Sequence, residues 1–201
     1  MLERFLDSDK LEAGCDEAGR GCLAGPVVAA AVILPGNYTN PLLNDSKKLS
    51  EPIRNKLRVE IESVALSYAV AFVDNRRIDE INILKASIQG MHQALSKLER
   101  VPAHIMVDGN KFFPYRDIPH QCVVKGDSIY LSIAAASVLA KTYRDEYMKQ
   151  LHSKWGYYGW DKNKGYPTPY HREAILHHGI SPFHRRTFQL VDQQLEIAFS
   201  G

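Results

Sequence analysis

Four acidic residues lie at the ends of short apolar segments or just before a predicted helix: Asp16, Glu17, Asp108 and Asp127. A desolvated carboxylate is costly unless it is paired or binds a metal ion. Because strand ends at one edge of an α/β sheet converge in space, these acids are expected to form one cluster. An all-oxygen cluster without His or Cys suits Mg²⁺ or Mn²⁺, and two such ions suit in-line phosphoryl transfer to water. Taken singly, each acid could instead be a helix cap or a turn residue.

The segment Gly19-Arg20-Gly21 directly follows the first two acids. Two glycines around one arginine leave backbone amides and carbonyls open to close approach by a ligand. The spacing fits neither the dinucleotide-binding G-x-G-x-x-G fingerprint nor a phosphate-binding P-loop. Two interpretations therefore stay open for this segment, a tight structural turn or a loop that reads a substrate.

A further candidate binding segment interleaves aromatic residues with lysines. Its aromatic residues are Trp155, Tyr157, Tyr158, Trp160 and Tyr166. This composition suits stacking on sugars or bases beside phosphate neutralisation, and burial in the core is the alternative. Local basic clusters occur at Lys47-Lys48, His171-Arg172 and His184-Arg185-Arg186. For any one of these clusters, a solvated surface is the simpler interpretation.

Composition places these residues in an ordinary globular chain. The 201 residues carry 25 Lys+Arg and 23 Asp+Glu, for a formal charge of +2, so neither a disordered nor a coiled-coil class is indicated. The three cysteines form no C-x-x-C pair, which favours reduced thiols in a cytoplasmic protein. The N-terminus lacks the features of a secretory signal, and the longest apolar run, Val27 to Leu34, is far shorter than the ~20 residues that span a bilayer. We therefore expect a soluble protein without membrane association.

The elements that must position these residues alternate between strands and helices. Apolar patterning predicts strands over 11–17, 27–34, 67–73, 103–107 and 121–124, and helices over 51–64, 79–98, 129–151 and 169–178. Consecutive strands come early and helices separate the later ones, which indicates an α/β fold with one central mixed sheet. Residues 1–201 are expected to form a single domain with a C-terminal helical region from about residue 152.

Several motifs in this order resemble bacterial ribonuclease HII, a type 2 ribonuclease H. They are Asp16 to Gly21 (DEAGRG), Gly25-Pro26, Asp45 to Leu49 (DSKKL), Val107-Asp108-Gly109, Lys125-Gly126-Asp127, Ala134 to Asp145 (AAASVLAKTYRD), Gly165 to Thr168 (GYPT) and His184 to Phe188 (HRRTF). Each motif alone is weak, but their combination is specific and covers nearly the whole chain.

The resemblance implies a ribonuclease H-like fold and endonucleolytic cleavage of the RNA strand in RNA/DNA hybrids. It also implies cleavage 5′ of single ribonucleotides in duplex DNA, leaving a 3′-hydroxyl and a 5′-phosphate, in removal of misincorporated ribonucleotides and RNA primers. The catalytic carboxylates, holding Mg²⁺ or Mn²⁺, would be Asp16, Glu17, Asp108 and Asp127. The substrate-binding residues would be Gly19, Arg20 and Gly21 at the 2′-hydroxyl, Tyr166 on the following deoxyribose, and Lys47, Lys48, Lys141 and Arg144 at phosphates.

The expected partners are RNA/DNA hybrids and ribonucleotide-containing duplex DNA, and the resemblance implies a monomer. Phe199 near the C-terminus is too little to indicate a sliding-clamp motif. Two rival functions remain open. One is a two-metal nuclease that cuts DNA regardless of a 2′-hydroxyl, and the other is a hybrid-binding module without hydrolytic activity.

Overall fold

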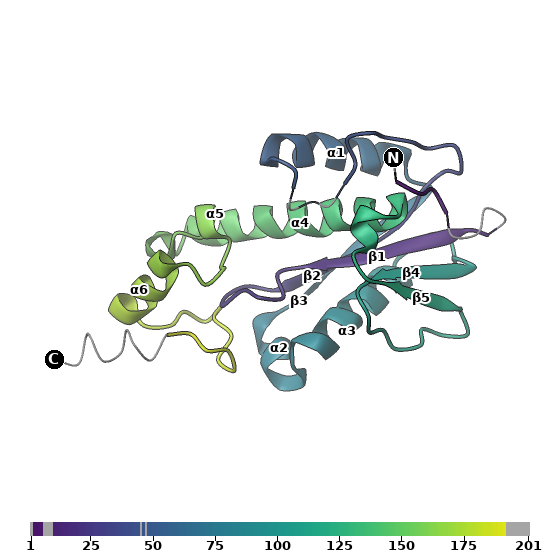
Figure 1. Ribbon diagram of the computed structural model, residues 1–201. Coiled ribbons are helices and arrows are strands. Elements are labelled where there is room, and N and C mark those ends of the chain that lie inside the picture. Colours follow the sequence, from purple (N-terminus) through teal and green to yellow (C-terminus); the bar gives the residue numbers. More distant parts are fainter. Residues whose placement is uncertain (1, 6–9, 45, 47, 192–201) are drawn as a thin grey trace.

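A five-stranded mixed sheet forms the centre of the computed structural model, which describes residues 2–5, 10–44, 46 and 48–191 (Figure 1). Its strands are β1 (Glu12–Ala18), β2 (Val27–Ile33), β3 (Ser67–Val73), β4 (His104–Asp108) and β5 (His120–Val123), in the spatial order β3-β2-β1-β4-β5. The pairs β1–β2 and β2–β3 are antiparallel, whereas β1–β4 and β4–β5 are parallel. The predicted α/β fold with a central mixed sheet is confirmed.

Helices cover both faces of the sheet (Figure 1). The long helix α4 (Leu131–His152) lies on one face beneath α1 (Glu51–Val64), and α2 (Asn75–Ile81) and α3 (Ile83–Ser96) lie on the other. The C-terminal region adds the 3₁₀ turn η2 (Gly156–Tyr158), α5 (Trp160–Asn163) and α6 (Pro169–His178) at the far end of α4. A second 3₁₀ turn, η1 (Gly126–Ser128), lies between β5 and the start of α4.

The prediction of one helix over 79–98 is wrong, because the helix is interrupted at Asn82. Asn82 has a φ of 67°, outside the helical region, and its side chain accepts a hydrogen bond from the amide of Lys85. Asparagine tolerates positive φ better than most residues and is a good N-cap. It therefore ends α2 and begins α3.

Small residues let α4 approach the sheet closely. Strand β2 is buried along its whole length, and the Ala134-Ala135-Ala136 stretch of α4 packs against its alanines and valines. An ideal Cβ on Gly14 of β1 would lie 2.2 Å from the carbonyl carbon of Ser132 in α4. The first turns of α4 are thus fixed directly over β1, the strand that carries Asp16.

No helix in the described ranges is long and apolar enough to cross a membrane.

Candidate active site

Two parallel strands bring the first candidate carboxylates together. Cys15 of β1 faces Val107 of β4, so the next positions along the two strands are Asp16 and Asp108. Glu17 and Asp108 also line one small pocket, with Arg20 and the first turns of α3. The carboxyl ends of these neighbouring strands therefore carry three acids in one place, as the spacing predicts.

The carboxylates of Asp16, Glu17 and Asp108 repel one another. Burial raises the pKa of Asp16 well above its usual value, and the charges of Glu17 and Asp108 raise it further. Arg20 donates to Glu17 across 3.2 Å and offsets part of the negative charge. Hard carboxylate oxygens of this kind fit Mg²⁺ or Mn²⁺.

The carboxyl groups do not point at one common centre. Adjacent residues of a strand face opposite sides of the sheet, so Asp16 points toward α4 and Glu17 toward α3. Accordingly, within the described part of the chain no group of three His, Cys, Asp or Glu side chains is arranged to hold a metal ion. The structure gathers the acids at one sheet edge without assembling a finished ligand set.

Asp127, the fourth candidate, belongs to the turn that follows β5. The backbone amide of Gly126 donates to Asp108 across 2.8 Å, which fastens this turn to the end of β4. Asp127 itself is buried, and the Ser128 hydroxyl donates to it at 3.5 Å. The turn therefore holds Asp127 next to Gly126, the residue whose amide is bonded to Asp108.

The loop at Gly19-Arg20-Gly21 is shaped by two buried arginines. The Arg185 guanidinium donates to the carbonyls of Gly19, Arg20 and Gly25 at 2.7, 2.9 and 3.1 Å. Gly19 has a φ of 96°, and an ideal Cβ there would lie 1.9 Å from Nε of Arg144. Only glycine fits that position, whereas the exposed Gly21 has open space where a side chain would stand.

Arg144 corrects one sequence-based expectation. It was expected to face phosphates, but its side chain is fully buried in α4 and donates to the carbonyls of Ala24, Pro26 and Lys164. All three nitrogens of the guanidinium are occupied by the backbone. Arg144 therefore ties the glycine loop to the C-terminal region, and its complete burial keeps it from contacting a phosphate.

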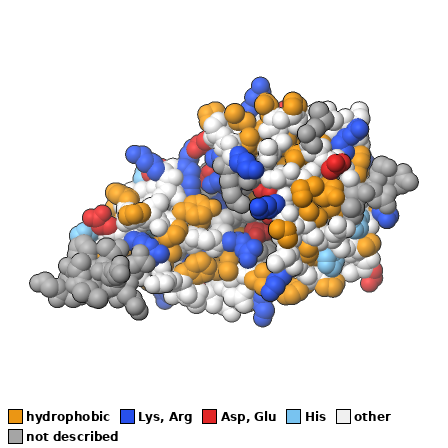
Figure 2. All heavy atoms as spheres, viewed as in Figure 1, with side chains coloured by type: hydrophobic (Ala, Val, Ile, Leu, Met, Phe, Trp, Pro, Cys, Tyr) orange, Lys and Arg blue, Asp and Glu red, His pale blue; other side chains and the backbone are white. Residues whose placement is uncertain are grey.

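The other cationic candidates have different positions. Lys141 is half-buried, donates to Asp145 across 2.6 Å and lies 5.6 Å from the centre of the Tyr166 ring. Lys48 is exposed, and Lys47 lies outside the described residues. Figure 2 shows Lys and Arg side chains near the middle of the visible face, around acidic atoms.

Tyr166 lies beside the glycine loop. Its side chain is 36% exposed, and its ring centre lies 5.9 Å from the guanidinium carbon of Arg144. The preceding residue, Gly165, accepts a hydrogen bond from the amide of Leu23 at 2.8 Å. The backbone directly before Tyr166 is thus attached to the segment that follows Gly21.

Ser137 of α4 connects the DSKKL motif to the first acid. Its side chain lowers the pKa of Asp16, and its hydroxyl lies 2.8 Å from the Ser46 hydroxyl. Arg54 of α1 donates to the carbonyls of Ser46 and Leu49, and its Nη2 approaches Asp145 at 3.5 Å. The segment that carries Lys48 is therefore held against α1 and α4.

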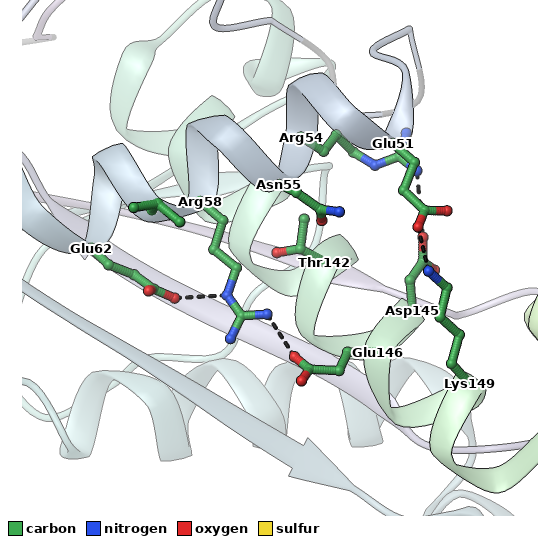
Figure 3. A pocket seen from close by; sticks show the side chains of 10 residues that line it. Glu51, Arg54, Asn55, Arg58, Glu62, Thr142, Asp145, Glu146 and Lys149 are labelled. Carbon is green, nitrogen blue, oxygen red and sulfur yellow. Dashed lines mark hydrogen bonds and ion pairs between the residues drawn. The ribbon is translucent and has the colours of Figure 1, made fainter. Parts of the chain in front are cut away.

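A groove between α1 and α4 is not a second site. Figure 3 shows that its charged side chains pair with one another: Arg58 bridges Glu62 and Glu146, at 2.8 and 2.7 Å, and Lys149 pairs with Glu51. Because each charged side chain drawn there has an ion-pair partner, these pairs hold the two helices together and leave none of the drawn charges unpaired for a ligand.

Several residues that look like surface in the sequence are buried. Trp160, Tyr158, His171, His184 and Arg185 are each at most 1% exposed. The solvated interpretation of the His184-Arg185 cluster is therefore wrong, as is a stacking role for Trp160 and Tyr158. Their polar atoms are satisfied by partners far along the chain, which no local pattern reveals.

The buried histidines predict how stability depends on pH. Burial lowers the pKa of His184 to about 4, against 6.5 for the unfolded residue. Between these values only the unfolded chain binds the proton, so the free energy of unfolding should fall by about 2–3 kcal/mol as the pH drops from 6.5 to 4. Urea unfolding at half-unit pH steps measures this slope. A His184→Asn variant, which keeps an acceptor for Ser181, should flatten it, and an equal slope in the variant would contradict the assignment.

Comparison with known proteins decides the family. The sequence model described as Ribonuclease HII matches residues 13–191. The chain belongs to the ribonuclease HII family. Ribonuclease HII of Parabacteroides distasonis is 58% identical over 199 residues, which cover 99% of this chain and 100% of that protein. As a member of this family, the chain is a hydrolase that cleaves RNA in RNA/DNA hybrids, and the family depends on divalent metal ions.

Solved structures agree with the family and the fold. Ribonuclease H2 from Pyrococcus horikoshii superposes with a TM-score of 0.76 at 28% identity, over 94% of this chain and 98% of that one. RNase HII from Archaeoglobus fulgidus, solved in complex with PCNA, gives a TM-score of 0.71 at 28% identity, over 93% and 99% of the two chains. Phe199 lies outside the described residues.

Proposed function

We propose that this ribonuclease HII cuts on the 5′ side of single ribonucleotides in duplex DNA as well as in longer hybrids, leaving a 3′-hydroxyl and a 5′-phosphate. The observation that carries the proposal is the adjacency of two features. A group of carboxylates ends β1 and β4, and the loop Gly19-Arg20-Gly21 with Tyr166 lies directly beside it. The first feature suits hydrolysis, and the second suits recognition of one sugar.

Asp16, Glu17, Asp108 and Asp127 would hold the divalent cations, which when bound supply an activated water and stabilise the departing 3′-oxygen. The chain's own task is to place the scissile phosphate against these carboxylates. The Glu17 amide donates to the Asp16 carboxylate, and the Gly126 amide orients Asp108. No serine, cysteine or histidine nucleophile is needed for this chemistry.

Selection of the ribonucleotide is assigned to the glycine loop. A 2′-hydroxyl both donates and accepts, so backbone amides and carbonyls can recognise it while a deoxyribose leaves them unmatched. Gly19 must be glycine to adopt its backbone conformation beside Arg144, and Gly21 leaves room for a sugar. Lys141, whose Nζ lies 5.6 Å from the Tyr166 ring centre, and the exposed Lys48 would neutralise phosphates, and Tyr166 would stack on the next sugar.

The decisive experiment uses an end-labelled DNA duplex with one embedded ribonucleotide beside the identical all-DNA duplex, each with Mg²⁺, Mn²⁺ or EDTA. Metal-dependent cutting only 5′ of the ribonucleotide is expected. Cutting of both duplexes would instead indicate a general two-metal nuclease. Binding without cutting would indicate the hybrid-binding module.

Replacing Tyr166 with alanine should lower the preference for the single-ribonucleotide duplex over a uniform hybrid by about tenfold, because stacking on one nucleotide contributes about 1–3 kcal/mol. The ratio of the two kcat/KM values measures this preference. Tyr68→Ala is a matched control, since Tyr68 on β3 has the same 36% exposure as Tyr166. An unchanged ratio in Tyr166→Ala would remove the stacking role.

A further inference from the structure

A buried chain of hydrogen bonds runs through the C-terminal region and ends on the backbone of Tyr166. The indole nitrogen of Trp160 donates to Nε2 of His171 at 2.9 Å, and Nδ1 of His171 lies 2.9 Å from the Tyr166 carbonyl oxygen. Nε2 of His184 lies 3.2 Å from Nε2 of His171. On its other side, Nδ1 of His184 accepts from the amide of Ser181 at 2.9 Å.

The groups that flank the two histidines determine which ring nitrogen of each histidine carries the proton. A carbonyl oxygen can only accept, so Nδ1 of His171 carries a proton and donates to Tyr166. An indole N–H can only donate, so Nε2 of His171 is bare and accepts. The Ser181 amide likewise makes Nδ1 of His184 an acceptor, and His184 donates through its Nε2. Both rings are neutral and each has one permitted tautomer.

This arrangement is shielded from water. His171 is 0% exposed and His184 is 1% exposed, and the aromatic rings of Trp160 and Tyr158 pack against them. The charged neighbours are Arg172 beside His171 and Arg185 beside His184 in the chain. A hydrogen bond in such surroundings fixes geometry more firmly than one at the surface.

The Tyr166 carbonyl is held from two sides. His171 donates to it from α6, and the amide of Thr168 donates to it at 2.8 Å. The ring of the same residue lies near Arg144, whose guanidinium carbon is 5.9 Å from the ring centre and which also binds the carbonyl of Ala24. Rotation of the peptide that follows Tyr166 would therefore move its ring relative to the glycine loop.

We propose that His171 is a positioning residue for Tyr166, and that the Trp160 indole, which donates to Nε2 of His171, keeps the proton of His171 on Nδ1. The inference rests on the proposed function, because it assigns Tyr166 to the nucleotide that follows the cut. His171 does not touch substrate. It donates from Nδ1 to the one carbonyl whose orientation sets the Tyr166 ring beside the sugar.

Two substitutions of similar size separate positioning from simple core stability. In His171→Asn the side-chain amide nitrogen takes the place of Nδ1 and keeps the donor to Tyr166. In His171→Gln the polar group takes the place of Nε2, and no donor remains at the Nδ1 position. Both variants disturb the same buried space, so a merely structural role predicts similar effects on cleavage.

The cleavage test compares kcat/KM on the single-ribonucleotide duplex and on a uniform hybrid. His171→Gln should lose about tenfold of the preference for the single ribonucleotide, since small misplacements of a positioning group cost one to two orders of magnitude in rate. His171→Asn should stay within about twofold of the unaltered protein, since its donor to Tyr166 is retained. His178→Gln, an exposed histidine at the end of the same helix, is the control.

A double-mutant cycle adds a readout that stability alone does not change. In a Tyr166→Ala background the effect of His171→Gln on the preference should disappear, because the residue being positioned is gone. An undiminished effect in that background would overturn the inference. Equal preferences in His171→Asn and His171→Gln would overturn it as well.

A spectroscopic measurement on the unaltered protein tests the inference without measuring cleavage. Long-range ¹H–¹⁵N correlation spectra of the histidine rings at pH 7 should show the Nδ1–H tautomer for His171 and the Nε2–H tautomer for His184. An Nε2–H tautomer at His171 would overturn the inference by itself. By contrast, failure of the unaltered protein to prefer the single ribonucleotide would contradict the proposed function, while this spectrum would still report whether His171 donates to Tyr166.

Discussion

Asp108→Asn is expected to lower kcat by about a thousandfold or more, which corresponds to about 4 kcal/mol of lost transition-state stabilisation. The substitution removes the negative charge that a divalent cation requires. It keeps the oxygen that accepts the Gly126 amide at 2.8 Å, so the turn that carries Asp127 stays fastened. Single-turnover cleavage of a labelled hybrid with Mn²⁺ measures the loss, and a gel-shift titration on the same hybrid should show affinity within about threefold of the unaltered protein.

The same variant should be more stable without metal. The charge of Asp108 raises the pKa of Asp16, which shows that the two carboxylates repel, and the neutral amide relieves this repulsion. We expect a gain of about 0.5–1 kcal/mol in the free energy of unfolding, together with a smaller stabilisation by added Mn²⁺. Asp117→Asn, at an exposed loop position, is the matched control. Near-full turnover in Asp108→Asn would remove Asp108 from the metal-binding group.

The sequence predicts those elements whose signals are local. Thr168, Pro169 and Gly179 are cap residues, and α6 begins and ends where they indicate, with the Thr168 hydroxyl accepting from the His171 amide. Strand β3 has the predicted bounds because its alternation follows the two faces of the sheet. The break at Asn82 was missed because apolar spacing continues across it. The local signal for a new helix start is Asn82, a good N-cap residue whose side chain accepts from the Lys85 amide.

The acids were predictable for a similar reason. A carboxylate pair that ends a buried strand is costly, and that cost is visible in the sequence itself. Arg144 and Arg185 could not be assigned in the same way. Their partners include Ala24, 120 residues from Arg144, and Arg20, 165 residues from Arg185, so only the assembled fold shows that they bind backbone carbonyls. Charge in a sequence favours a surface interpretation, and burial with complete pairing is the exception that the pattern does not reveal.

Arg185→Met is expected to reduce the free energy of unfolding by about 3–5 kcal/mol, because three buried carbonyls lose their donors at once. Burial lowers the pKa of Arg185 to about 10, so the side chain is still charged at neutral pH and its attraction to these oxygens is lost as well. Methionine has a similar length, which limits the cavity left behind. Urea unfolding measures the change.

Selectivity should fall together with stability in Arg185→Met. The lost bonds hold the carbonyls of Gly19 and Arg20, which belong to the loop assigned to the 2′-hydroxyl. At a temperature where the variant is folded, its preference for a ribonucleotide over deoxyribose at the cut should drop by about tenfold or more. Arg186→Met is the matched control, because Arg186 is the adjacent residue in the chain and its side chain is exposed. A destabilised Arg185→Met that kept full selectivity would mean that the glycine loop holds its shape without Arg185, and that Arg144 and the positive φ of Gly19 suffice to define it.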